Sequence, residues 1–128
     1  MPLVRISFLK GKPRGFGKDV ASVVYRTMVD TINVPPKDNF QVITEHEKGT
    51  LVYDPEYLDI PRTDGVVFVQ ITLNEGRTVE LKKAFFTTVA QRLHEELGVR
   101  LEDVFVNLVE VTRENWSFGN GIAQYAGS

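Results

Sequence analysis

Cysteine is absent from this chain of 128 residues. Its absence excludes disulfides, a thiolate nucleophile and a sulfur-ligated metal, and it fits an intracellular protein. Histidine is scarce as well: His46 and His94 are isolated, and His94 lies on a charged face of a predicted helix. Neither indicates a metal site or a catalytic triad, so we expect no metal.

An excess of positive charge and long apolar runs are also missing. Lysine and arginine number 15 against 17 acidic residues, a net charge of −2 that argues against a sequence-independent grip on nucleic acid. No apolar run approaches the roughly 18 residues that span a bilayer. The first residues alternate like a strand rather than a signal peptide. We therefore expect a single-domain cytoplasmic protein that binds neither nucleic acid nor membrane.

What the chain does contain is one pattern of strand, helix and strand, present twice. Apolar residues alternate in the strands and recur at helical spacing in the helices. Pro35 and Pro36 end the first helix, and Gly98 ends the second. The predicted elements are strand Val4–Phe8, helix Lys18–Ile32, strand Phe40–Thr44, strand Val66–Leu73, helix Val79–Leu97 and strand Val104–Glu110.

The two halves align without a gap. Identical residues recur 65 positions apart: Gly11 with Gly76, Lys18 with Lys83, Val24 with Val89, Val34 with Val99, and Asp38 with Asp103. We infer an internal duplication within one domain of residues 1–128, with repeats at about 2–45 and 66–111 and a C-terminal segment at 112–128. Each repeat should have parallel strands joined by a right-handed crossover. The alternative is a ferredoxin-like sandwich, which has the same element order but antiparallel pairing.

This order predicts an α/β (α+β) fold in which duplicated β-α-β units form a four-stranded sheet with two helices on one face. Two helices leave the other face uncovered, so we expect an oligomer that buries it. Between the repeats, residues 45–64 form a polar, turn-rich excursion in which a short strand at Leu51–Tyr53 is expected.

Pro2 is the first candidate for chemistry. It directly follows the initiator methionine, and so small a residue favours removal of Met1. The exposed secondary amine would lie at the mouth of the first strand, held by its ring and by strand pairing. An α-amino group has a reference pKa of roughly 7.7 to 8.0, which apolar surroundings lower, so it can act as base, acid or iminium-forming nucleophile. The alternative is that Pro2 only begins an edge strand.

Four further residues are candidates for binding and catalysis. Arg77 follows the third strand, where a planar guanidinium could capture a substrate carboxylate. Asp38 precedes the second strand, so parallel pairing would bring it close to Pro2. Trp116 and Phe118 lie in a glycine-bounded loop and could exclude water from a small site. The alternatives are a solvated charge, a loop carboxylate and packing aromatics.

Together, the N-terminal proline, the duplicated β-α-β units and the Trp-Ser-Phe-Gly segment resemble the tautomerase superfamily, and within it the malonate semialdehyde decarboxylases. The similarity covers nearly the whole chain. The segments that carry it are Pro2-Leu3, Val34-Pro35 with Asp38, Val66-Val67-Phe68, Arg77-Thr78, Ala84-Phe85, Gly98-Val99, Asp103-Val104 and Asn115-Trp116-Ser117-Phe118-Gly119. One departure is that the decarboxylase pattern has two arginines separated by one residue after the third strand, and here only Arg77 is present.

The resemblance implies the tautomerase fold, a homotrimer, a small carboxylate substrate and no cofactor. It implies a cationic or iminium-forming Pro2, with Asp38 as its polar partner or water activator. It also implies Arg77 as the carboxylate binder and Trp116 with Phe118 as an apolar wall. The first expectation is a lyase that decarboxylates a short 3-oxo acid, such as malonate semialdehyde, to acetaldehyde and CO2. The alternatives are a keto–enol tautomerase (an isomerase) of phenylpyruvate-like 2-oxo acids, a dehalogenase or hydratase homologue, and a non-enzymatic trimeric binding module that keeps its initiator methionine.

Overall fold

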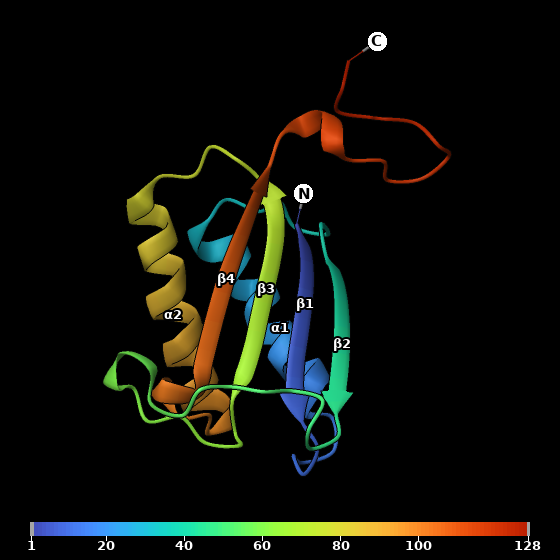
Figure 1. Cartoon of the computed structure of the whole chain (residues 1–128). Helices are drawn as coiled ribbons and strands as arrows, with labels where there is room; N and C mark the ends of the chain where they lie inside the picture. Colours follow the sequence, from blue (N-terminus) through green and yellow to red (C-terminus); the bar gives the residue numbers. More distant parts are fainter. Residues whose placement is uncertain (1, 128) are drawn as a thin grey trace.

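A computed structural model describes residues 2–127, which form a four-stranded sheet and two α-helices (Figure 1). The elements are β1 (Leu3–Leu9), α1 (Phe16–Thr31), β2 (Phe40–His46), β3 (Val67–Asn74), α2 (Val79–Leu97) and β4 (Val104–Val111). Short 3-10 helices lie at Tyr57–Asp59, Leu101–Asp103 and Arg113–Asn115. Every predicted helix and strand above is present, with its ends within two residues of the prediction, apart from the short strand discussed below.

The strands lie in the order β2-β1-β3-β4. β1 pairs in parallel with β2, β3 pairs in parallel with β4, and β1 and β3 are antiparallel. Each half is therefore a parallel β-α-β unit, as predicted, and the ferredoxin-like alternative is wrong. The register places Leu3 opposite Phe40 of β2 on one side and Thr72 of β3 on the other, which fixes the start of β1 inside the sheet.

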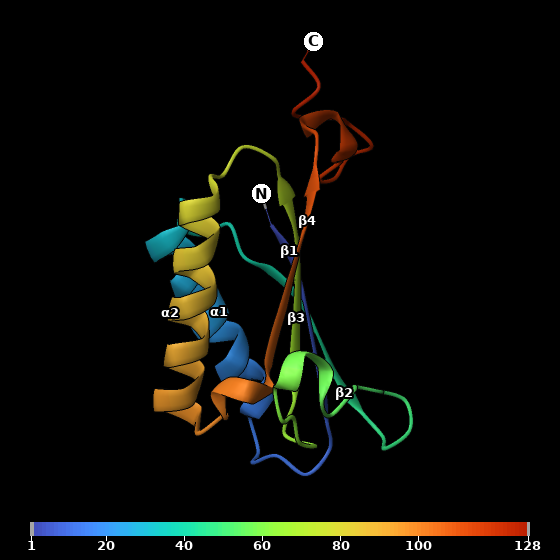
Figure 2. The ribbon, with the colours of Figure 1, turned by 60° about the vertical axis from the view of Figure 1, so that its left-hand side comes forward.

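Both helices cover the same face of the sheet, as Figure 2 shows edge-on. The opposite face carries exposed apolar side chains, because the odd-numbered residues of β1 and their register partners point away from the helices. Phe68 and Phe105 meet there with their ring centroids 5.1 Å apart. None of the described helices is both long and apolar enough to cross a membrane.

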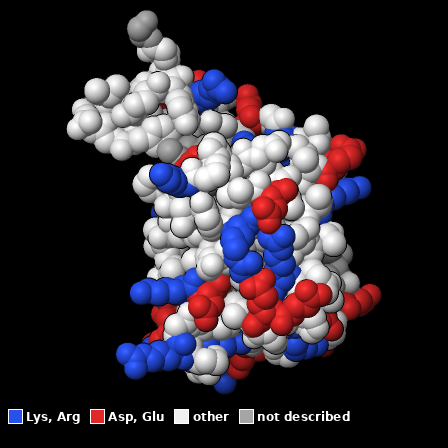
Figure 3. Space-filling view, turned by 180° about the vertical axis from the view of Figure 1, so that it is seen from behind, with Lys and Arg blue, Asp and Glu red and all other residues white. Residues whose placement is uncertain are grey.

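The outer surface of the helices is an ordinary charged surface, in which positive and negative side chains are interspersed (Figure 3). Two ion pairs join the helices: Arg26 with Glu96 at 2.7 Å and Arg92 with Asp30 at 2.8 Å. Exposed pairs of this kind contribute about 0 to 1 kcal/mol each, so they do not decide the fold.

The start of α1 differs from the prediction because its first residue, Phe16, is buried. The helix begins at Phe16 rather than Lys18, and the Phe16 ring packs edge-on against Phe8 with a centroid distance of 5.0 Å. Gly17 then allows the helix to approach the sheet, since a Cβ there would lie 2.7 Å from a methyl carbon of Ile43. The start of the helix is set by these tertiary contacts, which the apolar spacing alone does not show.

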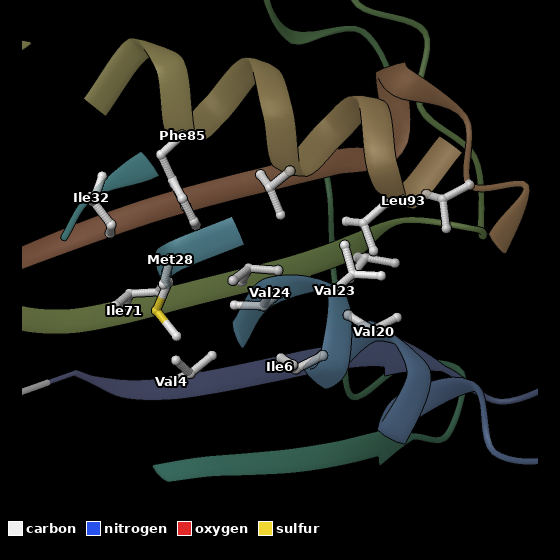
Figure 4. Packing of buried hydrophobic residues seen from close by; sticks show 14 of the residues in the cluster. Val4, Ile6, Val20, Val23, Val24, Met28, Ile32, Ile71, Phe85 and Leu93 are labelled. Atoms are coloured by element: carbon white, nitrogen blue, oxygen red, sulfur yellow. The ribbon is translucent and has the colours of Figure 1, made fainter. Parts of the chain in front are cut away.

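The core lies between the helices and the covered face of the sheet (Figure 4). Side chains from both halves interdigitate there, and the largest of those that are fully buried is Phe85 of α2. The labelled core residues are Val4, Ile6, Val20, Val23, Val24, Met28, Ile32, Ile71, Phe85 and Leu93. Burial of so many apolar side chains is the main stabilising contribution to the fold.

The strand predicted at Leu51–Tyr53 is wrong. β2 is followed by a turn in which the amide of Thr50 donates to the carbonyl of Glu47, and the chain then leaves the sheet edge without pairing. Leu51 is buried for another reason, because it packs with Leu9 and Val66 in a small second cluster. An apolar residue that is buried by a loop has the same sequence signal as one in a short strand.

Candidate active site

The starts of β1 and β2 and the ends of β3 and β4 meet at one edge of the sheet, because β1 and β2 run opposite to β3 and β4. Figure 1 shows this edge at the top, beside the N-terminus and the C-terminal segment. The predicted site residues all flank strands there: Pro2 before β1, Asp38 before β2, Arg77 after β3, and Trp116 and Phe118 after β4. The topology therefore gathers residues that are far apart in the sequence.

A hollow of about 220 Å³ lies at this edge. It is formed by the starts of two paired strands and by the C-terminal segment, and its lining is Pro2, Leu3, Phe40, Trp116, Ser117 and Phe118. Pro2 is buried in this wall. Ligand pockets of proteins usually measure about 300 to 1,000 Å³, so this hollow suits a compact molecule.

The C-terminal segment contributes a stack of aromatic rings. Trp116 and Phe118 lie almost parallel, with ring centroids 5.5 Å apart, and Tyr125 meets Phe118 edge-on at 4.9 Å. The side chain of Gln124 holds the loop closed, because it accepts from the amide of Phe118 at 3.0 Å and donates to the carbonyl of Gly119 at 3.0 Å. No residue after Glu114 carries a charged side chain, so the wall is apolar.

One hydrogen bond connects this aromatic segment to the sheet. The indole Nε1 of Trp116 donates to Oδ1 of Asn74, the last residue of β3, at 2.7 Å. Asn74 pairs with Val111 at the end of β4, and the amide of Glu75 donates to the Val111 carbonyl at 2.9 Å. The segment is thus fastened to the sheet edge a few residues after it leaves β4.

Arg77 is half-buried and is held by two main-chain carbonyls. Its Nε donates to Ile32 at 2.9 Å, and its Nη1 donates to the carbonyl of Asn74 at 3.1 Å. Among the described residues, none accepts a hydrogen bond from Nη2. A fixed guanidinium with donors left over is suited to binding a carboxylate.

Glu110 lies near Arg77, and its pKa is lowered by the groups around it. A hydrogen bond from Lys82 at 2.7 Å holds the pKa of Glu110 below its usual range, and the charge of Arg77 and the backbone of Gly76 act in the same direction. Burial opposes this shift. Glu110 is therefore anionic at neutral pH and lies close to the cations of Lys82 and Arg77.

Asp38 is half-buried in the loop before β2. Its amide donates to the carbonyl of Pro35 at 3.3 Å, and the adjacent amide of Lys37 donates to the hydroxyl of Tyr25 on α1 at 3.0 Å. Lys37 adopts a left-handed conformation with φ of 72°, which turns the chain into the strand. The helix therefore anchors the loop that presents Asp38.

The structure thus brings three of the predicted residues together in one wall, namely Pro2, Trp116 and Phe118. Asp38 and Arg77 lie at the same edge but are not among the described residues that line the hollow. Met1 lies outside the described residues, as does Ser128 at the end of the predicted C-terminal segment.

Sequence reasoning missed several residues of the site. Leu3 and Phe40 line the hollow, and Asn74, Gln124 and Tyr125 hold the aromatic segment. Phe40 could have been found from the sequence, since it is an aromatic residue at the start of a predicted strand, two residues after Asp38. No sequence pattern indicated Asn74, because its partner Trp116 is 42 residues away.

Proteins named as tautomerases are similar to this chain in sequence. Residues 38–119 match the model of the family named "Tautomerase enzyme". The chain is 44% identical over 124 residues to "Probable tautomerase YusQ" of Bacillus subtilis (strain 168), covering 97% of this chain and 98% of that one.

Two solved structures are similar to this chain in fold. FG41 malonate semialdehyde decarboxylase inhibited by 3-bromopropiolate is similar with a TM-score of 0.88 and 31% identity, covering 96% of this chain and 93% of that one. The "Q0 fused 4-OT wild type symmetric trimer" is similar in fold, with a TM-score of 0.78 and 23% identity over 98% of this chain and 99% of that one.

Proposed function

The chain belongs to the tautomerase family, and from that premise we propose that Pro2 is the catalytic group of an enzyme acting on small carboxylates. The observation that carries this proposal is the burial of Pro2 in the wall of an apolar hollow. Removal of Met1 turns the Pro2 nitrogen into a secondary amine, whose pKa is lowered by apolar surroundings. Such an amine can donate a proton, accept one or form an iminium near neutral pH.

The reaction we propose first is decarboxylation of a short 3-oxo acid such as malonate semialdehyde. Arg77 binds the carboxylate, and Pro2 protonates the carbonyl oxygen or converts the aldehyde to an iminium with loss of water. The bond between the carboxylate carbon and C2 then breaks, and its electron pair forms an enol or enamine with release of CO2. Protonation of C2 then gives acetaldehyde, with return of the hydroxyl proton to Pro2 in the enol route and hydrolysis of the iminium in the other.

The wall and the loop have separate roles in this proposal. Trp116 and Phe118 keep water from the carboxylate, which weakens its solvation before CO2 departs. Asp38 is the polar partner of the Pro2 amine or activates the water that hydrolyses the iminium. The similarity over nearly the whole chain to a malonate semialdehyde decarboxylase supports this reaction class.

Keto–enol tautomerisation of a 2-oxo acid is the second candidate. It is favoured by the 44% identity to a protein named a probable tautomerase, and by the single arginine after β3. In that reaction neutral Pro2 takes a proton from the enol hydroxyl and returns one to carbon. Protonation of the aldehyde needs a cationic Pro2, whereas tautomerisation and iminium formation need a neutral one. A rate that is high below the pKa of the amine therefore indicates decarboxylation by the protonation route.

Product analysis by NMR tests the proposal. Malonate semialdehyde and, separately, the enol of phenylpyruvate are incubated with the wild type and with Pro2→Ala. Acetaldehyde formed by the wild type and lost in Pro2→Ala supports the decarboxylase. Ketonisation alone, with malonate semialdehyde untouched, replaces it with the tautomerase. Turnover by protein that retains Met1, in which the Pro2 nitrogen is an amide, overturns the role of Pro2 in either reaction.

We also propose that the active form is a homotrimer. The uncovered face of the sheet exposes Phe40, Phe105 and Val109, which a partner would bury. The fused 4-OT with the same fold is a symmetric trimer. Sedimentation equilibrium tests this proposal: a mass of three chains supports it, and a monomer at micromolar concentration contradicts it.

A further inference from the structure

Asn74 links two parts of the proposed site that are separate in the sequence. Its side-chain Oδ1 accepts from Trp116 Nε1 at 2.7 Å, and its main-chain carbonyl accepts from Arg77 Nη1 at 3.1 Å. As the last residue of β3, Asn74 is held by pairing with Val111 of β4. One rigid strand end therefore contacts both the aromatic wall and the cation.

The contact with Trp116 determines how the wall is presented. The indole N–H is the only donor of the tryptophan side chain, and here it is turned towards Asn74. The indole also stacks on Phe118, with an angle of 19° between the rings. Fixing one edge of the indole thus fixes the position of the apolar stack that lines the hollow.

We propose that Asn74 is a positioning residue that sets the distance between the aromatic wall and Arg77, and thereby the size of the carboxylate that the site admits. This inference rests on the proposed function, in which Arg77 binds the carboxylate and Trp116 forms the wall. The two contacts of Asn74 use different atoms. A change of its side chain therefore releases the wall and leaves the carbonyl that holds Arg77 in place.

The chain contains a single tryptophan, so fluorescence reports Trp116 directly. Asn74→Leu keeps the approximate side-chain volume but removes the acceptor. We expect its emission to shift to the red and its quenching by acrylamide to increase. Asn74→Asp keeps an acceptor and should restore both values, a rescue that a merely structural role would not require. Gln91→Leu, the same kind of change on the exposed face of α2, is the matched control and should alter neither.

Binding is measured with malonate, an inert dicarboxylate, through the same fluorescence. Loss of one neutral hydrogen bond should weaken malonate binding by Asn74→Leu roughly two- to twelvefold. KM for the proposed substrates should rise by a similar factor while kcat changes less than about twofold, because Asn74→Leu weakens how the site holds the substrate but keeps the aromatic rings that exclude water from the carboxylate. Trp116→Phe removes the donor instead, and should raise KM by a comparable factor. The double variant should be no worse than the worse single variant.

The fluorescence and malonate-binding measurements each either support or overturn the role of Asn74. Unchanged Trp116 fluorescence in Asn74→Leu overturns the inference whatever the activity, as does altered fluorescence with unchanged malonate affinity. If Asn74→Leu does not fold, Asn74→Ala, which also removes the acceptor, takes its place in the cycle with Trp116→Phe. An additive cycle contradicts the coupling, and a non-additive one supports it. Malonate binding by the wild type without turnover of either substrate removes the proposed reaction alone, whereas failure of the wild type to bind malonate overturns both.

Discussion

The guanidinium of Arg77 donates from Nε to the carbonyl of Ile32 at 2.9 Å. Ile32 follows the last residue of α1, where helix carbonyls lack intrahelical partners and the helix dipole is negative. A side chain after β3 in the second half of the chain therefore closes the helix end of the first half. The proposed carboxylate anchor is thus held by the scaffold before any substrate binds.

Arg77→Ala should lower kcat/KM for a carboxylate substrate by the equivalent of about 2 to 5 kcal/mol, as expected for loss of one partner of a buried charge pair. Arg77→Lys should recover only part of this, since an ammonium cannot form the planar fork. Steady-state kinetics measure both variants. Arg113→Ala, an exposed arginine near the same edge, is the control. Unchanged kinetics in Arg77→Ala would favour the alternative interpretation, in which Arg77 is a charge without a role in substrate binding.

The mature, active chain should begin at Pro2. Intact-mass spectrometry of untagged protein should give a mass without the initiator methionine. An amide nitrogen is neither basic nor nucleophilic, so a protein that keeps Met1 and remains active would exclude the amine mechanism. Retention of Met1 without activity would instead favour the binding-module alternative.

Phe85→Ala should reduce the free energy of unfolding by about 3 to 5 kcal/mol, because it leaves a cavity in a fully buried region of the core. Its neighbour Phe86 is 38% exposed, and Phe86→Ala should cost far less. Urea unfolding at one fixed protein concentration measures both, since assembly would make stability depend on concentration. Equal effects in the two variants would contradict the observed phase of α2.

Stability should fall in acid partly through Glu110, whose pKa is held below its usual range by the hydrogen bond from Lys82. A depressed folded-state pKa gives stability that is present above the unfolded pKa of about 4.3 and is lost as the pH falls towards the folded value. Between pH 7 and 5 this contribution should be constant. Thermal unfolding from pH 7 to pH 3 should therefore show a shallower loss in Glu110→Gln than in the wild type. Parallel curves would show that this carboxylate does not contribute.

Local sequence signals predict the elements and their order. Apolar periodicity located both helices and all four strands of the described residues, and Gly98 gave the end of α2 because its left-handed φ of 70° suits glycine. These signals are local, since a strand or helix displays its buried face in consecutive residues. Parallel pairing within each half was predicted because a connection that contains a whole helix suits a crossover between parallel strands, and the observed pairing then excluded the ferredoxin-like alternative.

Other features depend on contacts between residues that are far apart in the sequence. The antiparallel join between β1 and β3 brings the start of one strand to the end of the other, and that join places Pro2 and Asn74 at one edge. The bond from Trp116 to Asn74 spans 42 residues, and no periodicity encodes such a contact. The early start of α1 at Phe16 and the loop burial of Leu51 likewise depend on neighbours distant in the chain. A local pattern shows which face of a helix or strand is apolar, but it does not show which distant residues will pack against that face.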